Sequence, residues 1–268
     1  MTLLAVTSIT ALVIGQVLMP AAAAGPAAAG GTDQGRQIFA EVSRRDAGYG
    51  DQRAGVSMQL KRKSGAATTR TMEIATLEVA NDGTRTIVSF DSPLDVKGTK
   101  VLTYSHDEQD DEQWIYLPAF KRVKQIADAS KTTSFMGSEF TYEDLNSLNI
   151  QLDKFSYRYI KTEDVNGAAC FVVERVPLYP RSGYKRQVVW IDKVKYVVVK
   201  VEYYDRKDSL QKTLSLSGYR QYAGTFWRAD EMLMTNHQSG DATALRWTGY
   251  TFKNGLAVND FSASALKR

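Results

Sequence analysis

The chain contains few of the residues that carry most protein chemistry. Its 268 residues include one cysteine, Cys170, and two histidines, His106 and His237. One cysteine cannot form a disulfide within the chain, and the apolar neighbours of Cys170 favour a buried thiol over a reactive one. The histidines stand in separate predicted loops beside acidic residues, without the three or four ligands at defined spacing that zinc requires. The sequence therefore predicts no metal site and no cofactor, and the loop around His106 is interpreted as acidic and solvated.

The motifs of common enzyme classes are missing as well. No G-x-S-x-G nucleophile elbow, no G-x-G-x-x-G dinucleotide loop and no phosphate-binding P-loop occurs. The pairs Asp107-Glu108 and Glu143-Asp144 are groups that glycosidases use, but such pairs arise by chance in any chain of this length. We interpret Glu143 and Asp144 as the polar face of a short helix. The sequence therefore predicts no catalytic residues and a protein that is not an enzyme.

Charge of one sign is also scarce. Lys and Arg exceed Asp and Glu by only four, and the isoelectric point is about 8.9. Nucleic-acid-binding domains usually have an isoelectric point above about 9 and a clustered basic stripe. We therefore expect no nucleic-acid partner, whereas transient contact with anionic lipid head groups is compatible with this charge.

The N-terminus carries an apolar run that is too short for a confident membrane span. Leu3–Met19 is uncharged, and the small residues Pro20–Ala24 follow it as a cleavage site of the A-x-A type. This pattern predicts a signal peptide over 1–24, a flexible Ala/Gly/Pro linker over 25–32 and a periplasmic domain over 33–268. No basic residue precedes Leu3, so an uncleaved anchor helix stays the alternative.

Period-two alternation dominates the rest of the chain. One amphipathic helix is expected first, over 33–45, with Asp33 as its cap. Strands follow, separated by turns such as Asn81-Asp82-Gly83. We expect them over 56–60, 72–79, 85–90, 100–104, 113–117, 122–126, 155–161, 170–176, 186–191, 196–204, 210–219, 227–235 and 244–250. A helix-compatible segment with a Ser138 cap, over 137–148, interrupts them, and a short terminal helix is expected over 260–267. The pattern predicts a mainly β protein, a curved antiparallel sheet with this segment across its open face.

Aromatic and basic residues concentrate between Asp111 and Leu145. An aromatic lining would make the concave face of an incompletely closed barrel a site for an acyl chain. The candidate lipid-binding residues are Trp114, Tyr116, Phe120, Phe135, Met136, Phe140 and Tyr142. The candidate docking residues are Lys121, Arg122 and Lys124. These three fit either a solvated strand edge or a surface for an acidic partner or lipid head groups.

Two runs in this region carry a family resemblance. Trp114–Val123, WIYLPAFKRV, followed by Ser134–Leu145, SFMGSEFTYEDL, resembles the outer-membrane lipoprotein-sorting family in a divergent LolA-like branch. The resemblance implies an unclosed antiparallel β-barrel with a few helices covering its concave face. It also implies a periplasmic carrier of lipid or lipoprotein acyl chains, with an inner-membrane exporter of the resistance-nodulation-division (RND) type as a possible partner. Here the segment 135–145 would form the lid.

Two other functions stay open at this point. The same barrel could act as an envelope sensor that detects lipid and signals to a membrane partner. A hydrolase would require a serine or aspartate beside His106 or His237 inside the cavity, and the sequence shows no such pair.

Overall fold

The computed structural model describes residues 30–147 and 150–267. The predicted signal peptide, 1–24, and the first five residues of the predicted linker lie outside this range. Helix α1 (Gly30–Asp46) begins three residues earlier than expected, so the last three residues of the predicted linker are helical. Asp33 therefore lies within the first turn, where its carboxylate interacts favourably with the helix dipole, rather than at the cap. No helix in the described ranges is both long enough and apolar enough to cross a bilayer.

Thirteen strands of the described residues form one antiparallel sheet. They are β1 (Asp51–Lys61), β2 (Ala67–Glu78), β3 (Thr84–Ser92), β4 (Lys100–Ser105), β5 (Glu112–Leu117), β6 (Arg122–Gln125), β7 (Phe155–Val165), β8 (Ala168–Pro177), β9 (Tyr184–Asp192), β10 (Val198–Asp205), β11 (Leu210–Ser217), β14 (Glu231–Asn236) and β15 (Ala242–Phe252). The expected strand over 227–235 is broken at Ala229. Its first part, β13 (Phe226–Arg228), pairs instead with β12 (Arg220–Tyr222) in a separate hairpin.

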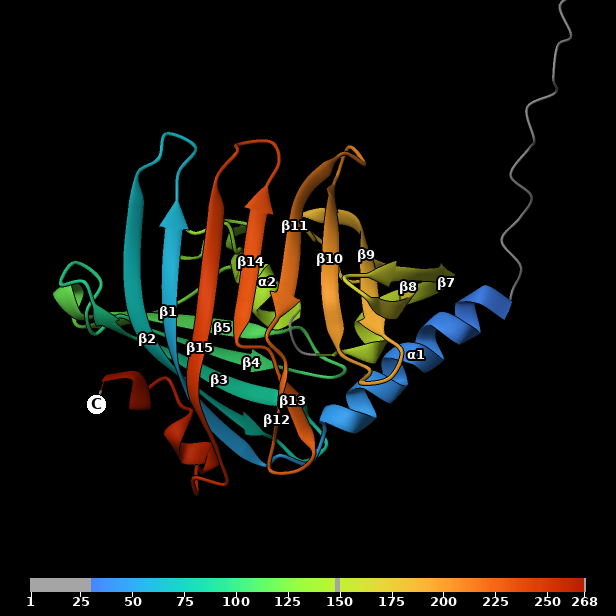
Figure 1. Ribbon diagram of the computed structural model, residues 1–268. Helices are drawn as coiled ribbons and strands as arrows, with labels where there is room; N and C mark the ends of the chain where they lie inside the picture. Colours follow the sequence, from blue (N-terminus) through green and yellow to red (C-terminus); the bar gives the residue numbers. More distant parts are fainter. Residues whose placement is uncertain (1–29, 148–149, 268) are drawn as a thin grey trace, which may run out of the picture.

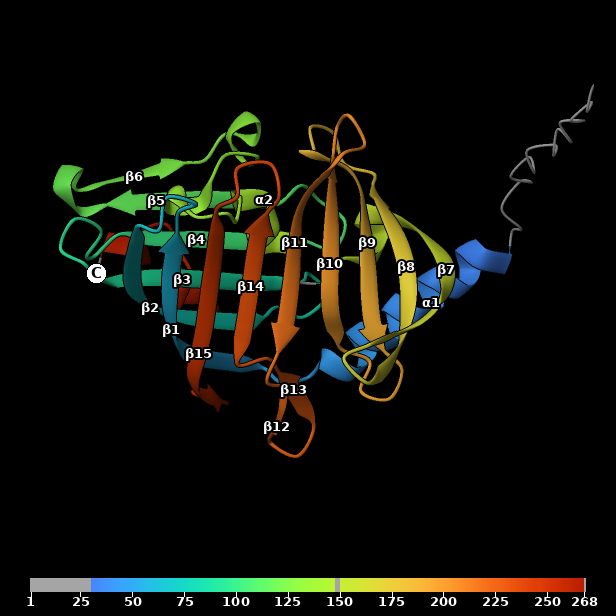
Figure 2. The ribbon, with the colours of Figure 1, turned by 45° about the horizontal axis from the view of Figure 1, so that its top comes forward.

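The sheet curls without closing. Its order is β6-β5-β4-β3-β2-β1-β15-β14-β11-β10-β9-β8-β7, so β6 and β7 are its two edges. The pairing of β1 with β15 joins two sequence-local meanders, and β3 to β5 pass behind the steep strands β15 to β10 (Figures 1 and 2). This arrangement confirms the predicted unclosed barrel.

Short helices cover the concave face. The segment between β6 and β7, which we call the covering segment, contains η2 (Asp128–Ser130), η3 (Phe135–Gly137), α2 (Tyr142–Ser147) and η4 (Leu152–Lys154). Helix α1 packs along β7 (Figure 2). The buried stripe of α1, which is Ile38, Phe39 and Val42, joins the main core under these elements, as its spacing predicted.

The convex face has a smaller core of its own. Leu102 on β4 packs there with Phe261 and Leu266 from the C-terminal segment. This segment forms two short turns, η5 (Val258–Asp260) and η6 (Ala265–Lys267), where one terminal helix was expected. The part of the sheet from β2 to β6 is therefore covered on both faces, and each face there buries one half of the alternating side chains.

Candidate functional site

An apolar cavity of about 260 Å³ lies between the concave face and the covering segment. Strand register explains its composition: Val56 on β1 stands opposite Met72 on β2, and Ile74 stands opposite Val88 on β3. Because cross-strand partners point to the same face, one residue in two from each strand turns inward. The lining includes Val56, Met58, Met72, Ile74, Val88, Val189, Val201, Leu214, Leu216, Met232 and Leu245.

Asp144 on α2 ties the covering segment to the far half of the sheet. Its side chain is 1% exposed and accepts a hydrogen bond of 2.6 Å from the Lys212 ammonium, which is 3% exposed. The Tyr184 hydroxyl donates to the same carboxylate at 2.8 Å, and the Thr141 amide donates at 2.7 Å. The sequence interpretation of Asp144 as part of a solvated helix face is therefore wrong. Thr141, rather than Ser138, precedes α2, and its hydroxyl accepts the Asp144 amide at 3.2 Å.

Glu143 forms a second buried anchor beside the first. Its carboxylate accepts hydrogen bonds from the Ser182 hydroxyl, the Gly183 amide at 2.8 Å and the Tyr179 hydroxyl at 2.8 Å. Burial raises the pKa of Glu143 above its ordinary value, although these donors oppose the shift. Glu143 is thus also buried, contrary to the sequence interpretation, and both carboxylates fix α2 against the chain that enters β9.

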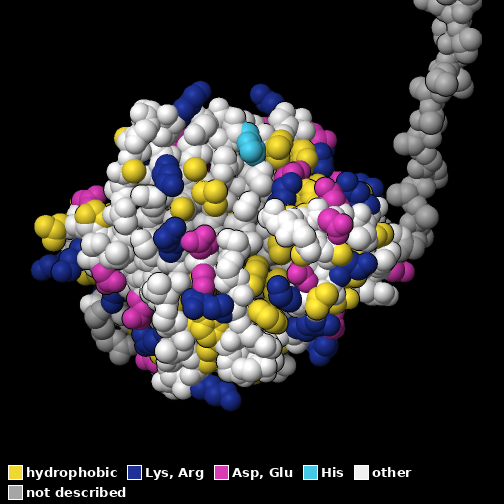
Figure 3. Space-filling view, in the orientation of Figure 1, with side chains coloured by type: hydrophobic (Ala, Val, Ile, Leu, Met, Phe, Trp, Pro, Cys, Tyr) yellow, Lys and Arg dark blue, Asp and Glu magenta, His cyan; other side chains and the backbone are white. Residues whose placement is uncertain are grey.

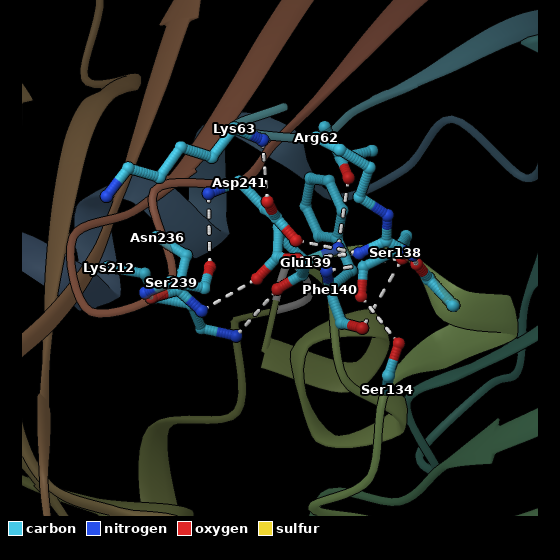
Figure 4. A network of polar contacts seen from close by, with 12 residues as sticks. Arg62, Lys63, Ser134, Ser138, Glu139, Phe140, Lys212, Asn236, Ser239 and Asp241 are labelled. Carbon is cyan, nitrogen blue, oxygen red and sulfur yellow. Dashed lines mark hydrogen bonds and ion pairs between the residues drawn. The ribbon is translucent and has the colours of Figure 1, made fainter. Parts of the chain in front are cut away.

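Glu139 connects the other end of the covering segment to the strand hairpins (Figure 4). The Asn236 amide donates to its carboxylate at 2.7 Å, and the Arg62 guanidinium lies 3.9 Å away. Arg62 also pairs with Asp241 at 2.8 Å. The turns of β1–β2 and β14–β15 therefore hold the segment from outside the cavity.

Polar and aromatic residues surround one end of the cavity, which we call the mouth. They come from the end of α1, the β9–β10 turn, the β12–β13 hairpin and β15, and include Arg45, Asp46, Lys195, Trp227 and Arg228. Arg228 pairs with Asp46, and its Nε donates to Gln52 at 2.8 Å. The Lys195 ammonium lies 5.4 Å from the ring centre of Trp227. The cavity is thus apolar along its walls and charged at its mouth.

The predicted lipid-binding residues separate into three groups. Phe135 and Phe140 line the cavity and are 3% and 1% exposed. Met136 and Tyr142 pack against the same core but do not line the cavity.

Trp114, Tyr116 and Phe120 are placed elsewhere. Trp114 and Tyr116 join the convex core, under the C-terminal segment, and Phe120 is 70% exposed. The intervening Ile115 is the apolar residue of β5 that faces the concave core. The expectation that all seven aromatic and methionine residues share one site is therefore corrected. The inward residues of β9 to β15 were missed, although their period-two alternation was visible.

The candidate docking residues lie at the free edge of the sheet. Lys121, Arg122 and Lys124 are all exposed, and the last two belong to edge strand β6. The η1 turn (Pro118–Phe120) follows β5 and lies beside the loop that connects β3 to β4. In this loop, Gly98 lies next to the ring of Pro118. Phe120 and Leu94, the latter 88% exposed, thus project from the same end of the sheet.

The two histidines lie away from the cavity. His106 contacts Asp82 at 2.7 Å, and His237 contacts the Thr213 hydroxyl at 2.8 Å. Neither histidine lines the cavity. Within residues 30–147 and 150–267 no group of three or more His, Cys, Asp or Glu side chains is arranged to hold a metal. The cavity offers apolar burial and charge at its mouth.

An open barrel with a covered apolar cavity defines the class of lipid-binding carrier folds. The solved structures agree. A domain from Vibrio parahaemolyticus that is named for outer membrane lipoprotein sorting is 45% identical, with a TM-score of 0.85 over 88% of this chain and 100% of that chain. A DUF1329 family protein from Desulfovibrio piger is 31% identical, with a TM-score of 0.83 over 88% and 99%. A LolA superfamily protein from Nitrosomonas europaea shares the fold at 14% identity, with a TM-score of 0.69 over 85% and 97%.

The chain belongs to the outer-membrane lipoprotein-sorting family, as the resemblance implied, and shares its fold with the LolA superfamily protein. A family model described only as an uncharacterized protein matches residues 82–268. No curated protein matches the chain.

Proposed function

We propose that the protein is a non-enzymatic periplasmic carrier that binds an acyl chain of a lipid or lipoprotein for sorting to the outer membrane. The covered apolar cavity is the observation that carries this proposal. Each methylene transferred from water into such a cavity contributes about 0.8 kcal/mol. The family relationship supports a lipid-binding fold, and the cargo and the direction of transport belong to the proposal.

Ligand binding tests the proposal directly. Delipidated protein is titrated with a fluorescent fatty acid, and saturable binding at one site is expected. Leu216 lines the cavity, and its cross-strand partner Met232 lines it too. Leu216→Trp should therefore fill the cavity and weaken binding at least tenfold.

A matched control uses the opposite face of the neighbouring strand. Leu233 on β14 is the cross-strand partner of Ser215, the residue before Leu216, so its side chain points to the other face of the sheet. It is 41% exposed. Leu233→Trp should leave the affinity unchanged. Absence of saturable binding to the unaltered protein, or an equal loss in both variants, would contradict binding in this cavity.

We further propose that the β6 edge contacts an anionic membrane surface during transfer. Leu94 and Phe120 supply exposed apolar groups, and Lys97, Lys121 and Arg122 are exposed beside them, as are the two acidic residues Asp91 and Asp95. Apolar insertion combined with basic residues is the usual basis of reversible binding to anionic bilayers. Figure 3 shows yellow and dark-blue side chains together where this end projects at the left, with acidic side chains close to them.

Vesicle flotation distinguishes membrane contact from a solvated edge. Phosphatidylglycerol vesicles should bind the protein more than phosphatidylcholine vesicles do, and Phe120→Ser with Leu94→Ser should abolish the difference. If the variant floats with phosphatidylglycerol vesicles as well as the unaltered protein does, the proposed membrane contact is refuted. An RND-type exporter in the inner membrane is the protein partner that we propose for cargo transfer, as the family resemblance implied.

A further inference from the structure

We propose that the cavity accepts a single-chain amphiphile with an anionic head, and that Lys195, Arg228 and Arg45 at the mouth bind the head. This inference rests on the proposed acyl-chain binding and specifies its ligand class. It is carried by the polarity of the cavity along its length, by the charges at the mouth and by the volume.

The cavity changes character from its interior to its mouth. Interior residues such as Met58, Leu214 and Val201 are between 0% and 4% exposed. At the mouth, the side chains of Arg45 and Lys195 are 39% and 40% exposed. A chain that buries its methyl end inside therefore places its head among partly hydrated polar groups.

More basic than acidic side chains line the mouth. Among its described residues that line the cavity, Arg45, Lys195 and Arg228 are basic and Asp46 is acidic. Asp46 pairs with Arg228, which is held further by Gln52. Glu41, which does not line the cavity, pairs with Arg45 at 2.7 Å, so the Lys195 ammonium is the mouth cation that an anionic head meets without a hydrogen-bonded carboxylate.

Of the three mouth cations, Lys195 has the longest ion pair. Its ammonium lies 3.9 Å from Asp192, beyond hydrogen-bond distance. The Asp192 carboxylate instead accepts the backbone amides of Val194 and Lys195, both at 2.8 Å. The ammonium lies over the Trp227 ring, so it is aimed at the mouth and can pair with an incoming carboxylate.

Arg45, the second mouth cation, is held in place by contacts within the protein. Arg45 donates to the Val194 carbonyl at 2.8 Å, and its guanidinium lies 4.2 Å from the ring centre of Tyr196. These contacts fix the β9–β10 turn to the end of α1. Little side-chain entropy is then lost when the head binds, which favours affinity.

The volume limits the number of chains. Pockets for drug-sized ligands are roughly 300–1,000 Å³, and this cavity, at about 260 Å³, is just below that range. One chain fits this space better than the several chains of a multiply acylated anchor. We therefore infer a fatty-acid-like ligand, with one alkyl chain and one anionic group.

The test compares two ligands that differ only in the head. Dodecanoate and dodecanol are titrated into the delipidated full-length protein at pH 8, with intrinsic tryptophan fluorescence as the readout, because Trp227 and Trp247 line the cavity. We expect dodecanoate to bind about tenfold more tightly, the ratio that a charge-assisted contact of about 1.4 kcal/mol produces. The ratio should fall as salt is raised.

Two variants of the same turn separate a specific contact from general charge. Lys195→Gln should weaken dodecanoate binding about threefold to tenfold and leave dodecanol binding unchanged. Lys193→Gln is the matched control, because Lys193 is exposed, lies over Phe171 and does not line the cavity. The control should retain the affinities of the unaltered protein for both ligands.

Each contrary outcome has a distinct meaning. Equal affinities for the two ligands would overturn the anionic head while leaving acyl-chain binding intact. An equal loss of dodecanoate binding in both variants would also overturn the specific contact, because it would reflect net charge alone. If neither ligand binds, the proposed carrier function fails together with this inference.

Discussion

The buried pair of Asp144 and Lys212 should control the attachment of the covering segment. Asp144→Asn keeps the shape of the side chain and its acceptor for Thr141 but leaves an ammonium, 3% exposed, without its anion. Removing one member of a buried ion pair typically costs about 3–5 kcal/mol. Because domains are stable by only about 5–15 kcal/mol, this variant should remain folded but lose a large part of its stability.

The second half of a double-mutant cycle tests whether the pair itself is responsible. Lys212→Met removes the ammonium, so the double variant no longer contains an unpaired buried charge. It should be more stable than Asp144→Asn alone, because the cost of the unpaired ammonium is no longer present. Glu231→Gln, which breaks the exposed pair with Arg246 at 3.3 Å, is the control and should cost no more than about 1 kcal/mol.

Urea unfolding followed by circular dichroism measures the unaltered protein, the two single variants of the pair, the double variant and the control. Hydrogen exchange of residues 134–145 shows whether the loss is concentrated in the covering segment, as the anchoring contacts require. A cost below about 1 kcal/mol for Asp144→Asn, or simple additivity in the double variant, would refute the reasoning.

Two further predictions follow from burial. Phe135→Ala should lower the unfolding free energy by about 3–5 kcal/mol, because the ring packs against Phe90 and Tyr142. The exposed Phe120 is the control, and Phe120→Ala should change the unfolding free energy by no more than about 0.5 kcal/mol. The urea midpoints of the two variants test this difference. Burial in the folded protein raises the pKa of Glu143, so the folded protein binds this proton more tightly than the unfolded chain does. The free energy of unfolding should therefore fall as the pH rises from about 4.5 through the folded-state pKa. Glu143→Gln should remove this part of the pH dependence, and identical slopes for both proteins between pH 4 and 7 would contradict it.

Local patterns determined most of the fold. The period-two runs located nearly all the strands, and the stripe of Ile38, Phe39 and Val42 located the buried face of α1. The break at Ala229 was missed, because an apolar run shows the same alternation whether its halves pair with one partner or with two. The resemblance in Trp114–Leu145 identified the family, which the comparisons confirm.

The same patterns could not say which face of a strand looks inward. Trp114 and Tyr116 alternate with Ile115, but only the curl of the sheet makes the face of Ile115 concave. Phe261, from the far end of the chain, then covers the outer face. Two alternating sets of apolar residues are equivalent until both layers are in place.

The sequence by itself therefore determined the elements and the family, because both depend on residues that are neighbours in the chain. Tertiary structure alone decided the cavity and its chemistry. The buried Asp144 meets Lys212 from β11, and the mouth joins Arg45, Lys195 and Arg228 from three distant elements. Such contacts follow from the pairing of β1 with β15 and the curl of the sheet, long-range events that no local spacing records.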